Sequence, residues 1–279
     1  MRVWKGHGTE NDFVVVPDLD GALSVTPGLV RALCDRHAGI GADGMLRVVR
    51  AENDPESKEM SADAEFFMDY RNADGSLAEM CGNGVRVFMR YLLATNVVGP
   101  DAAVATRGGI MRVHARTDGD ISVHMGRPRI LADRPVVTAA PLTRAAIAAV
   151  LMPNPHVVLT VSEAELVALD LTRAPLLDQP LPEGQNVEFV AELGPRHVRM
   201  RVHERGVGET RSCGTGICAV VVALATAQGV GADGTTWRVD VPGGTCRVVW
   251  TDDGVELTGP AVLVGEIEID DAWLADVAT

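Results

Sequence analysis

A Cys-Gly-x-Gly pattern occurs twice in this 279-residue chain, each time directly before a largely apolar stretch. The copies are Cys81-Gly82-Asn83-Gly84 and Cys213-Gly214-Thr215-Gly216, so they lie 132 residues apart, nearly half of the chain. Repeats of about 20–50 residues indicate solenoids or propellers, whereas an interval of this size indicates a duplicated domain. The sequence therefore predicts an α/β (α+β) protein made of two pseudo-symmetric halves.

Most of the predicted secondary structure is β-strand. Alternating apolar and polar residues are typical of half-buried strands, and they occupy residues 110–115, 120–125, 197–203, 237–241 and 246–250. Turn-forming pairs such as Asp118-Gly119 and Gly243-Gly244 lie between neighbouring segments. Because such pairs close tight hairpins, we expect mostly antiparallel sheets.

Fewer helices are expected. Thr26-Pro27 opens one that runs to about residue 36, because proline at the first helical position loses no hydrogen bond. Ser162 and Glu165 form a capping box at the start of another. Two more follow the glycine pattern, at roughly 85–95 and 217–227. The acidic segment 51–65 has no periodicity and is expected to be a solvated loop.

Charge and lysine content argue against several classes of function. The chain has 38 Asp and Glu against 25 Lys and Arg, a formal net charge of -13, which repels nucleic acids and anionic membranes. We therefore expect neither as a partner. Lys5 and Lys58 are the only lysines, and neither follows a strand with a glycine-rich phosphate loop. This argues against a Schiff base with pyridoxal phosphate.

The five cysteines are odd in number and include no Cys-x-x-Cys pair, unlike those of a secreted disulfide framework. No signal peptide is visible before the first apolar run. The uncharged stretch 212–232 contains too few helical residues to cross a bilayer, because several glycines interrupt it. We expect a cytoplasmic protein with reduced thiols and no metal.

The repeated pattern also suggests a chemistry. Gly-x-Gly lets a ligand approach the backbone, and the helix that follows offers N–H groups that bind carboxylates. The same field stabilises a thiolate just before the helix and lowers its pKa from about 8.5. If the halves face each other across a cleft, one thiolate removes a proton from a substrate carbon while the opposite thiol donates one.

The pair of thiols, Cys81 and Cys213, therefore predicts an enzyme that inverts a stereocentre by using two bases. A single cysteine at a helix start is usually only a small buried apolar residue, but two copies at matching positions favour catalysis. The cysteines without the glycine context, Cys34, Cys218 and Cys246, are expected in the core.

Longer motifs resemble those of the diaminopimelate epimerase family, and the resemblance spans nearly the whole chain. The matching segments are 6–13, 39–44, 70–76, 80–86, 154–157, 184–188 and 202–216. The resemblance implies that each half is a mostly antiparallel sheet wrapped around a central helix, with the active site in the cleft between the halves. It also implies that the C-terminal strand returns to the first domain. We therefore expect one domain of residues 1–126 plus 265–279 and a second of residues 127–264.

The same resemblance implies an activity. Members of the family convert LL-2,6-diaminopimelate to the meso form in lysine and peptidoglycan biosynthesis, as homodimers without cofactor or metal. Cys81 and Cys213 would be the acid/base pair, and His156 and Glu204 would tune the pKa values of the thiols. The residues implied to hold the substrate are Asn11, Asn72, Gly82, Asn83, Asn154, Asn186, Glu204, Arg205, Gly214 and Thr215.

Two segments depart from the common pattern of the family. Ala42-Asp43-Gly44 stands where many members have Phe-Asp-Gln, so a substrate contact from a glutamine is missing here. Pro153 replaces the glycine that is common before Asn-Pro-His and rigidifies that loop.

Other functions share some of these features. A proline racemase-like or hydroxyproline epimerase-like enzyme would use the same two thiols, but Glu204-Arg205 and the asparagines suit a substrate with a second charged end. A thiol redox switch, in which Cys81 and Cys213 form a disulfide, belongs to a different class. A module that only binds would not need both thiols.

Overall fold

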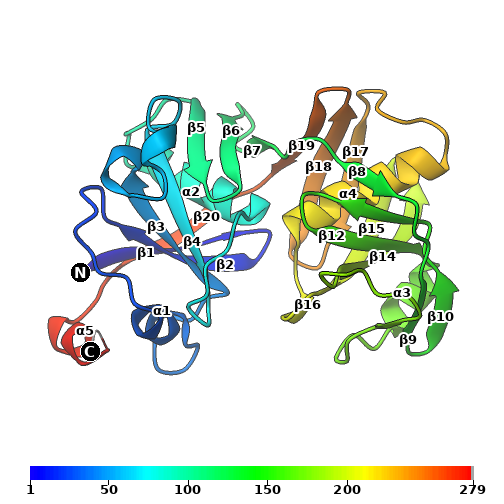
Figure 1. The fold of residues 1–279 in the computed structure, drawn as a ribbon, viewed down its shortest axis with the longest axis horizontal. Coiled ribbons are helices and arrows are strands. Elements are labelled where there is room, and N and C mark those ends of the chain that lie inside the picture. The colour runs from blue at the N-terminus through cyan, green and yellow to red at the C-terminus, as the bar shows by residue number, and fades with distance from the viewer. Residues whose placement is uncertain (278–279) are drawn as a thin grey trace. The chain divides into compact units, whose positions relative to one another are not determined.

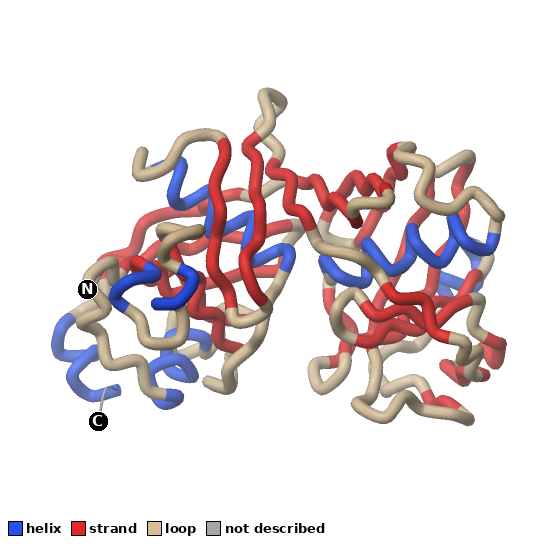
Figure 2. The backbone as a smooth tube through the Cα atoms, turned by 45° about the horizontal axis from the view of Figure 1, so that its top comes forward, coloured by secondary structure: helices blue, strands red, loops and turns tan. Residues whose placement is uncertain are grey.

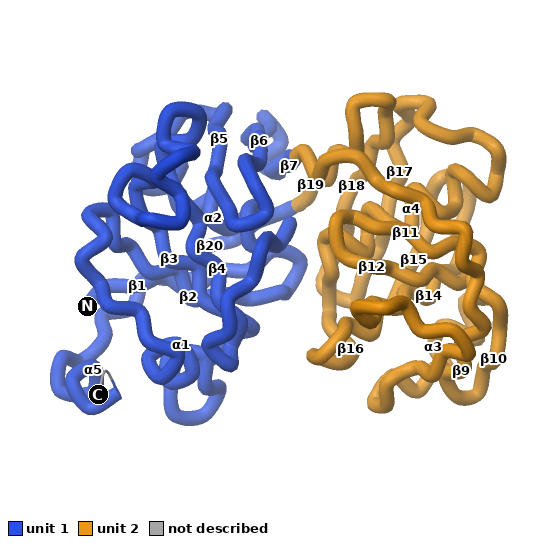
Figure 3. The backbone as a smooth tube through the Cα atoms, viewed as in Figure 1, with its two compact units in different colours: residues 1–123, 260–279 blue, residues 124–259 orange. Residues whose placement is uncertain are grey.

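The computed structural model describes residues 1–277, and the chain forms two compact units (Figures 1 and 3). Unit 1 consists of Met1–Val123 and the chain from Pro260 onward, and unit 2 consists of His124–Gly259. Strands dominate both units, with few helices among them (Figure 2). The predicted mixed α/β protein with two similar halves is confirmed.

Unit 1 contains one sheet with the strand order β20-β1-β2-β3-β4-β5-β6-β7. Its strands are β1 (Arg2–Gly8), β2 (Asn11–Pro17), β3 (Gly44–Arg50), β4 (Phe66–Asn72), β5 (Asp101–Thr106), β6 (Gly109–Ala115), β7 (Ile121–His124) and β20 (Val262–Glu268). Its helices are α1 (Pro27–Cys34), α2 (Gly82–Ala94) and α5 (Asp271–Val277), with short 3₁₀ turns at Ala51–Asn53 and Lys58–Met60.

Unit 2 contains a sheet with the order β8-β11-β12-β14-β15-β17-β18-β19. Its strands are β8 (Arg129–Leu131), β11 (Ala148–Leu151), β12 (Pro155–Thr160), β14 (Asn186–Gly194), β15 (His197–Glu204), β16 (Gly208–Thr210), β17 (Thr236–Val241), β18 (Gly244–Thr251) and β19 (Gly254–Gly259), and a small second sheet is made of β9 (Val136–Ala139), β10 (Leu142–Ala145) and β13 (Leu176–Leu177). Its helices are α3 (Glu163–Ala168) and α4 (Gly214–Ala227).

The two units repeat the same pairing scheme. In unit 1 the β2–β3 and β4–β5 pairs are parallel and the other pairs are antiparallel. In unit 2 the parallel pairs are β12–β14 and β15–β17, at the same places in the order. Parallel neighbours need a crossover connection, and α1, α2, α3 and α4 lie in these crossovers. The sheets are therefore mostly, but not purely, antiparallel.

One helix lies at the centre of each unit. Helix α2 packs against strands across the sheet of unit 1, and α4 does the same in unit 2. Every residue from Gly214 to Ala225 is buried, which is the pattern of a helix surrounded by protein on all sides. The sheets curve around these helices, so the first turn of each helix lies within the protein.

The C-terminal segment differs in part from the expected strand 265–279. Strand β20 spans Val262–Glu268 and pairs with β1, but the chain then turns into helix α5 (Asp271–Val277). Asp270 causes this change, because its Oδ1 accepts hydrogen bonds from the backbone N–H groups of Ala272 and Trp273, as a helix cap does. Residues 278–279 of the expected strand lie outside the described residues.

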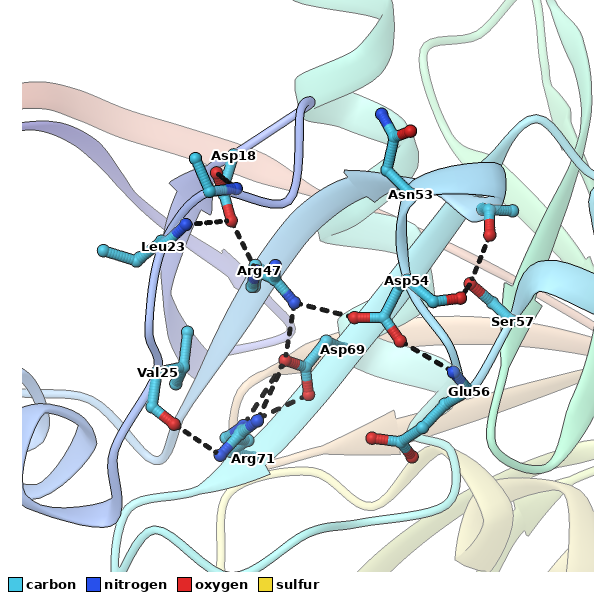
Figure 4. Close-up of polar contacts among 12 residues, drawn as sticks. Asp18, Leu23, Val25, Arg47, Asn53, Asp54, Glu56, Ser57, Asp69 and Arg71 are labelled. Atoms are coloured by element: carbon cyan, nitrogen blue, oxygen red, sulfur yellow. Dashed lines mark hydrogen bonds and ion pairs between the residues drawn. The ribbon is translucent and has the colours of Figure 1, made fainter.

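Most acidic residues of segment 51–65 are exposed, as expected of a solvated loop, but Asp54 is buried. Arg47 on β3 is buried, and its guanidinium contacts Asp18, Asp54 and Asp69 at 2.8, 2.9 and 3.5 Å (Figure 4). Burial alone would raise the pKa of Asp69, but hydrogen bonds from Arg107 and Arg71 outweigh it, so this pKa is lowered. A buried ion pair between Asp54 and Arg47 therefore holds the segment against β3. The local sequence does not reveal this pairing.

The Arg47→Ala variant should be destabilised by about 3–5 kcal/mol, because it leaves buried carboxylates without their cation. Urea unfolding followed by circular dichroism measures this loss. Arg2→Ala is the matched control, since its ion pair with Glu266 is exposed and should contribute less than about 1 kcal/mol. Equal midpoints for the two variants would show that the Arg47 network adds no stability.

Candidate active site

The two predicted cysteines occupy the same position in the two units. Each is the N-cap of its central helix, with an extended backbone, and its Sγ accepts a hydrogen bond from the N–H three residues later. The Sγ–N distance is 3.4 Å both from Cys81 to Gly84 and from Cys213 to Gly216. The glycine pattern is therefore the first turn of each helix, and both helices begin earlier than the expected residues 85 and 217.

In unit 1, two asparagines gather at Cys81. The Cys81 thiol lies 3.6 Å from Asn11 Oδ1, which also accepts a hydrogen bond from Asn83 Nδ2 at 3.2 Å. Asn83 is fully buried in the first turn of α2 together with Gly82. Asn11 comes from β2 and Asn83 from α2, so the sheet and the helix together place both amides beside the thiol.

Asp43 holds the other end of Asn11. Its Oδ2 accepts a hydrogen bond from Asn11 Nδ2 at 2.7 Å, and its Oδ1 forms an ion pair with Arg36 at 2.7 Å. Burial and the charge of Asp12 raise the pKa of Asp43 despite the hydrogen bond from Asn11. Asp12 has a lowered pKa because hydrogen bonds from Arg36 and Lys5 outweigh its burial. This charged cluster turns the Asn11 amide so that its oxygen faces Cys81.

Asn72 lies in a separate turn at the end of β4. Its Oδ1 accepts a hydrogen bond from the Tyr70 hydroxyl at 3.0 Å, and its Nδ2 donates to Ser76 Oγ at 3.0 Å. Tyr70 also explains the departure at Gly44. A Cβ at position 44 would lie 2.6 Å from the Arg71 carbonyl oxygen and 2.8 Å from the Tyr70 ring. A glutamine cannot occupy this position unless β4 moves.

In unit 2, Cys213 lies among carboxylates. Burial raises the pKa of the Cys213 thiol well above its usual range, and the charges of Glu204 and Glu188 raise it further. Hydrogen bonds from Thr215 and Gly216 offset this only in part. The expected lowering of the thiol pKa by the helix N-terminus is therefore wrong for Cys213, because desolvation and two negative charges exceed it.

Glu204 contacts Cys213 directly. The carboxylate accepts a hydrogen bond from the Cys213 thiol, and it accepts another from the Thr210 hydroxyl. Burial raises the pKa of Glu204, and these hydrogen bonds reduce the effect. Strand β15 ends at Glu204 and pairs with β16, which ends at Thr210. The end of this strand pair therefore positions the Glu204 carboxylate beside the Cys213 thiol.

His156 contacts Glu188 in the interior of unit 2. The distance from His156 Nδ1 to Glu188 Oε1 is 2.6 Å, and both side chains have no exposed area. His156 Nε2 lies 2.9 Å from Asn154 Oδ1. The parallel register of β12 and β14 sets His156 opposite Asn186, so three predicted site residues lie at the same end of two neighbouring strands.

Asn186 connects the segment of Asn154 and His156 to Arg205 through two hydrogen bonds. Its Nδ2 donates to the Pro155 carbonyl at 3.1 Å, and its Oδ1 accepts from the Arg205 backbone N–H at 3.0 Å. The Arg205 guanidinium donates to the Glu183 carbonyl, and its side chain passes over Gly184, where a Cβ would lie 2.9 Å away. The structure thus gathers Asn154, His156, Asn186, Glu204, Arg205, Cys213, Gly214 and Thr215 in unit 2.

Sequence reasoning did not select Asp43, Tyr70, Glu188 or Thr210 as site residues. The strand that carries Glu188 is buried on both faces from Asn186 to Ala191, so alternation says nothing about where its side chain points. The available signal was an acidic residue within an otherwise apolar strand, which in a buried strand requires a partner.

Neither a metal cluster nor a membrane span is found in residues 1–277. Within that range, no group of three or more His, Cys, Asp and Glu side chains is arranged to hold a metal ion. No described helix is long and apolar enough to cross a bilayer. All five cysteines are free thiols.

Comparison with known proteins identifies the family. The family model for diaminopimelate epimerase matches residues 3–131 and 148–264. The chain belongs to the diaminopimelate epimerase family. It is 55% identical to a diaminopimelate epimerase of Streptomyces coelicolor, over 98% of this chain and 96% of that protein. It is 48% identical to a diaminopimelate epimerase of Thermobifida fusca, over 96% of this chain and 98% of that protein.

Solved structures of low sequence identity share the fold. A phenazine biosynthesis protein from Bacillus anthracis superposes with a TM-score of 0.69 at 15% identity, covering 97% of this chain and 99% of its own. A hydroxyproline epimerase from Agrobacterium vitis gives a TM-score of 0.66 at 16% identity, covering 100% and 98%. At these identities the likeness concerns the architecture alone.

The Glu204→Gln variant should lower the pKa of Cys213, because it removes a negative charge that disfavours the thiolate. Alkylation of Cys213 by iodoacetamide is followed by mass spectrometry of the Cys213 peptide across alkaline pH. The alkylation rate of the variant should begin to rise at a lower pH than that of the wild type. Glu209→Gln is the control, since Glu209 is exposed and paired with Arg201. Superimposable profiles for Glu204→Gln and wild type would contradict the charge effect.

Proposed function

We propose that this chain interconverts LL- and meso-2,6-diaminopimelate by a two-base proton transfer between Cys81 and Cys213, in lysine and peptidoglycan biosynthesis. The observation that carries the proposal is the duplicated thiol cap in a member of the diaminopimelate epimerase family. Two equivalent helix N-termini, each with a thiol at its cap, supply one base and one acid for the same reaction. The two units would be the two epimerase domains, and each would contribute one of the two thiols.

The proton transfer is balanced without any other reactant. The Cys81 thiolate takes the α-proton, so the C–H bond breaks and an S–H bond forms. The Cys213 thiol gives its proton to the opposite face of the same carbon and becomes a thiolate. The raised pKa of Cys213 supports this direction, because it keeps that residue protonated as the acid. The reverse reaction exchanges the two roles.

The carbanion needs stabilisation, since the chain supplies no electron sink. The N–H groups in the first turns of α2 and α4 are directed at the position of the α-carboxylate in this proposal. They would stabilise charge as it spreads from the α-carbon into the carboxylate. Closure of the domains would expel water and strengthen these interactions.

The remaining polar residues would hold the charged ends of the substrate. We assign this role to Asn11, Asn72, Gly82, Asn83, Asn154, Asn186, Glu204, Arg205, Gly214 and Thr215. The amides of Asn11 and Asn186 support the assignment, because other polar groups of their own unit fix their orientation before a substrate binds. Such preorganisation lowers the entropic cost of positioning the substrate.

The setting of the enzyme is part of the proposal. We infer a cytoplasmic homodimer that acts on a small zwitterion, without cofactor or metal. Diaminopimelate carries two ammonium and two carboxylate groups, so an acidic chain with a net charge of -13 need not repel it.

The deciding experiment is incubation of freshly reduced protein with LL-diaminopimelate in deuterated water, with chelator and without cofactor. The stereochemistry and deuterium content of the α-carbon are followed together. Formation of the meso isomer with deuterium at the inverted carbon is expected. Deuterium exchange into proline or hydroxyproline, but not into diaminopimelate, would show that the substrate is a different amino acid. No exchange into any of them would contradict the proposed function.

Cys81→Ala and Cys213→Ala should each reduce epimerisation by at least about 10³-fold, because each removes one of the two proton carriers. The same isotope experiment measures the loss. Cys218→Ala is the matched control, since Cys218 is a buried thiol on α4 without a capping role. A single Cys81 or Cys213 variant that epimerises near the wild-type rate would rule out the two-base scheme.

Asp43→Ala should weaken substrate binding, because Asn11 loses the carboxylate that fixes its amide. A hydrogen bond to a charged group contributes about 1.5–3 kcal/mol, so KM should rise by roughly 10-fold or more, with a smaller change in kcat. Steady-state kinetics separates the two constants. Asp63→Ala, an exposed position of unit 1, is the control, and an unchanged KM in Asp43→Ala would contradict the role of Asp43.

A further inference from the structure

The buried His156–Glu188 pair has a counterpart in unit 1 that is not charged. In unit 2, β12 sets His156 opposite Asn186 of β14, and Glu188 follows two residues later. In unit 1, β2 sets Phe13 opposite Gly44 of β3, and Leu46 follows two residues later. The duplicated fold therefore places His156 where unit 1 has Phe13, and Glu188 where it has Leu46.

In unit 1 both members of the pair lie against the first turn of the central helix, and in unit 2 Glu188 does. A Cβ at Gly84 would lie 3.3 Å from Leu46 and 3.6 Å from Phe13. A Cβ at Gly216 would lie 2.7 Å from Glu188 Oε1. The same site beneath the thiol cap is therefore filled by two apolar side chains in unit 1 and by an ion pair in unit 2.

The ion pair is not explained by the needs of packing. Phe13 and Leu46 are fully buried and fill the equivalent site, so the architecture tolerates an apolar pair. Burying two charges costs desolvation energy that their attraction often fails to recover. Moreover, Glu188 Oε2 is buried and receives no hydrogen bond from residues 1–277, which adds to that cost.

The contacts of the imidazole indicate its protonation. Nδ1 faces a carboxylate oxygen of Glu188 at 2.6 Å, and Nε2 faces the amide oxygen of Asn154 at 2.9 Å. Asn154 Oδ1 and an ionised Glu188 are both acceptors, and a histidine donates to two acceptors at once only as an imidazolium. The negative charge that stabilises this cation in a dry interior is that of Glu188.

We propose that Glu188 is a positioning residue of the active site, which keeps His156 charged and holds its Nε2 toward Asn154. This inference rests on the proposed function, in which His156 tunes the thiols. Through His156, Glu188 fixes the Asn154 amide.

The direct test is NMR of the protein labelled with ¹⁵N-histidine, with the His156 signal assigned by its loss in His156→Phe. In the wild type, His156 should remain an imidazolium at pH 7, with both nitrogens protonated. In Glu188→Gln, which keeps the shape of the side chain but loses its charge, His156 should be neutral at pH 7. This measurement does not depend on turnover, so it stands even if the protein fails to epimerise diaminopimelate.

Kinetics supplies the second readout. Glu188→Gln should lower kcat by roughly 10–100-fold, because a slightly misplaced catalytic group costs about that much, with a smaller change in KM. Glu188→Asp keeps the charge but shortens the reach, and it should recover the imidazolium only in part. Glu192→Gln is the matched control, since Glu192 lies exposed on the same strand and should leave kcat unchanged.

A double substitution that copies the unit 1 residues into unit 2 separates the effect of charge from the effect on folding. The double variant His156→Phe with Glu188→Leu recreates the pair of unit 1 and should fold with a Tm at or above that of the wild type. Its kcat should equal that of His156→Phe alone, because Glu188 acts through His156. A neutral His156 in the wild type, an unchanged kcat in Glu188→Gln, or a double variant that does not fold would each overturn the proposal.

Discussion

A hydrogen bond from a backbone N–H to a cysteine sulfur, at the first turn of a buried helix, is the interaction on which both units depend. It fixes the start of α2 at Cys81 and the start of α4 at Cys213. Both helices lie at the centres of their units, and the first turn of each is buried. Helix α4 is buried from Gly214 to Ala225 and therefore has no face that solvent covers.

The duplication explains why other residues of the candidate site have counterparts at equivalent positions in the second unit. The strand before the first crossover begins at Asn11 in unit 1 and directly after Asn154 in unit 2. Each asparagine orients its amide oxygen toward a group of its own unit, the Cys81 thiol in one case and the His156 ring in the other. One ancestral arrangement of strand, crossover and helix thus accounts for contacts that involve different side chains.

The sequence predicted those features whose signals are local or repeated. Alternation located β6, β7, β15, β17 and β18, and the duplicated cysteine pattern located both helix starts to within a turn. Features that depend on distant partners were missed: the segment 51–65 is fastened by Arg47, which precedes it on β3, and Glu188 gives no sign in its own strand of facing His156. The thiol pKa was mispredicted at Cys213 because a helix N-terminus is visible in the sequence, whereas surrounding carboxylates are visible only in the fold.

The two halves have the same architecture, but the buried charges beside the starts of their central helices differ in sign. Near the start of α2, the buried guanidinium of Arg86 donates to neutral oxygens of Gly82, Thr9 and Pro260, so a positive charge lies beside the first turn of this helix. The corresponding residue of α4 is Cys218, and Cys213 faces Glu204 and Glu188 instead. In the proposed reaction, a single negative charge moves from one thiol to the other. Such surroundings favour that charge on the side of Arg86, and the imidazolium proposed for His156 would reduce the imbalance by neutralising Glu188. An epimerase must run in both directions, so the ion pair that packing does not require would keep the two thiols close enough in energy for either to serve as the base.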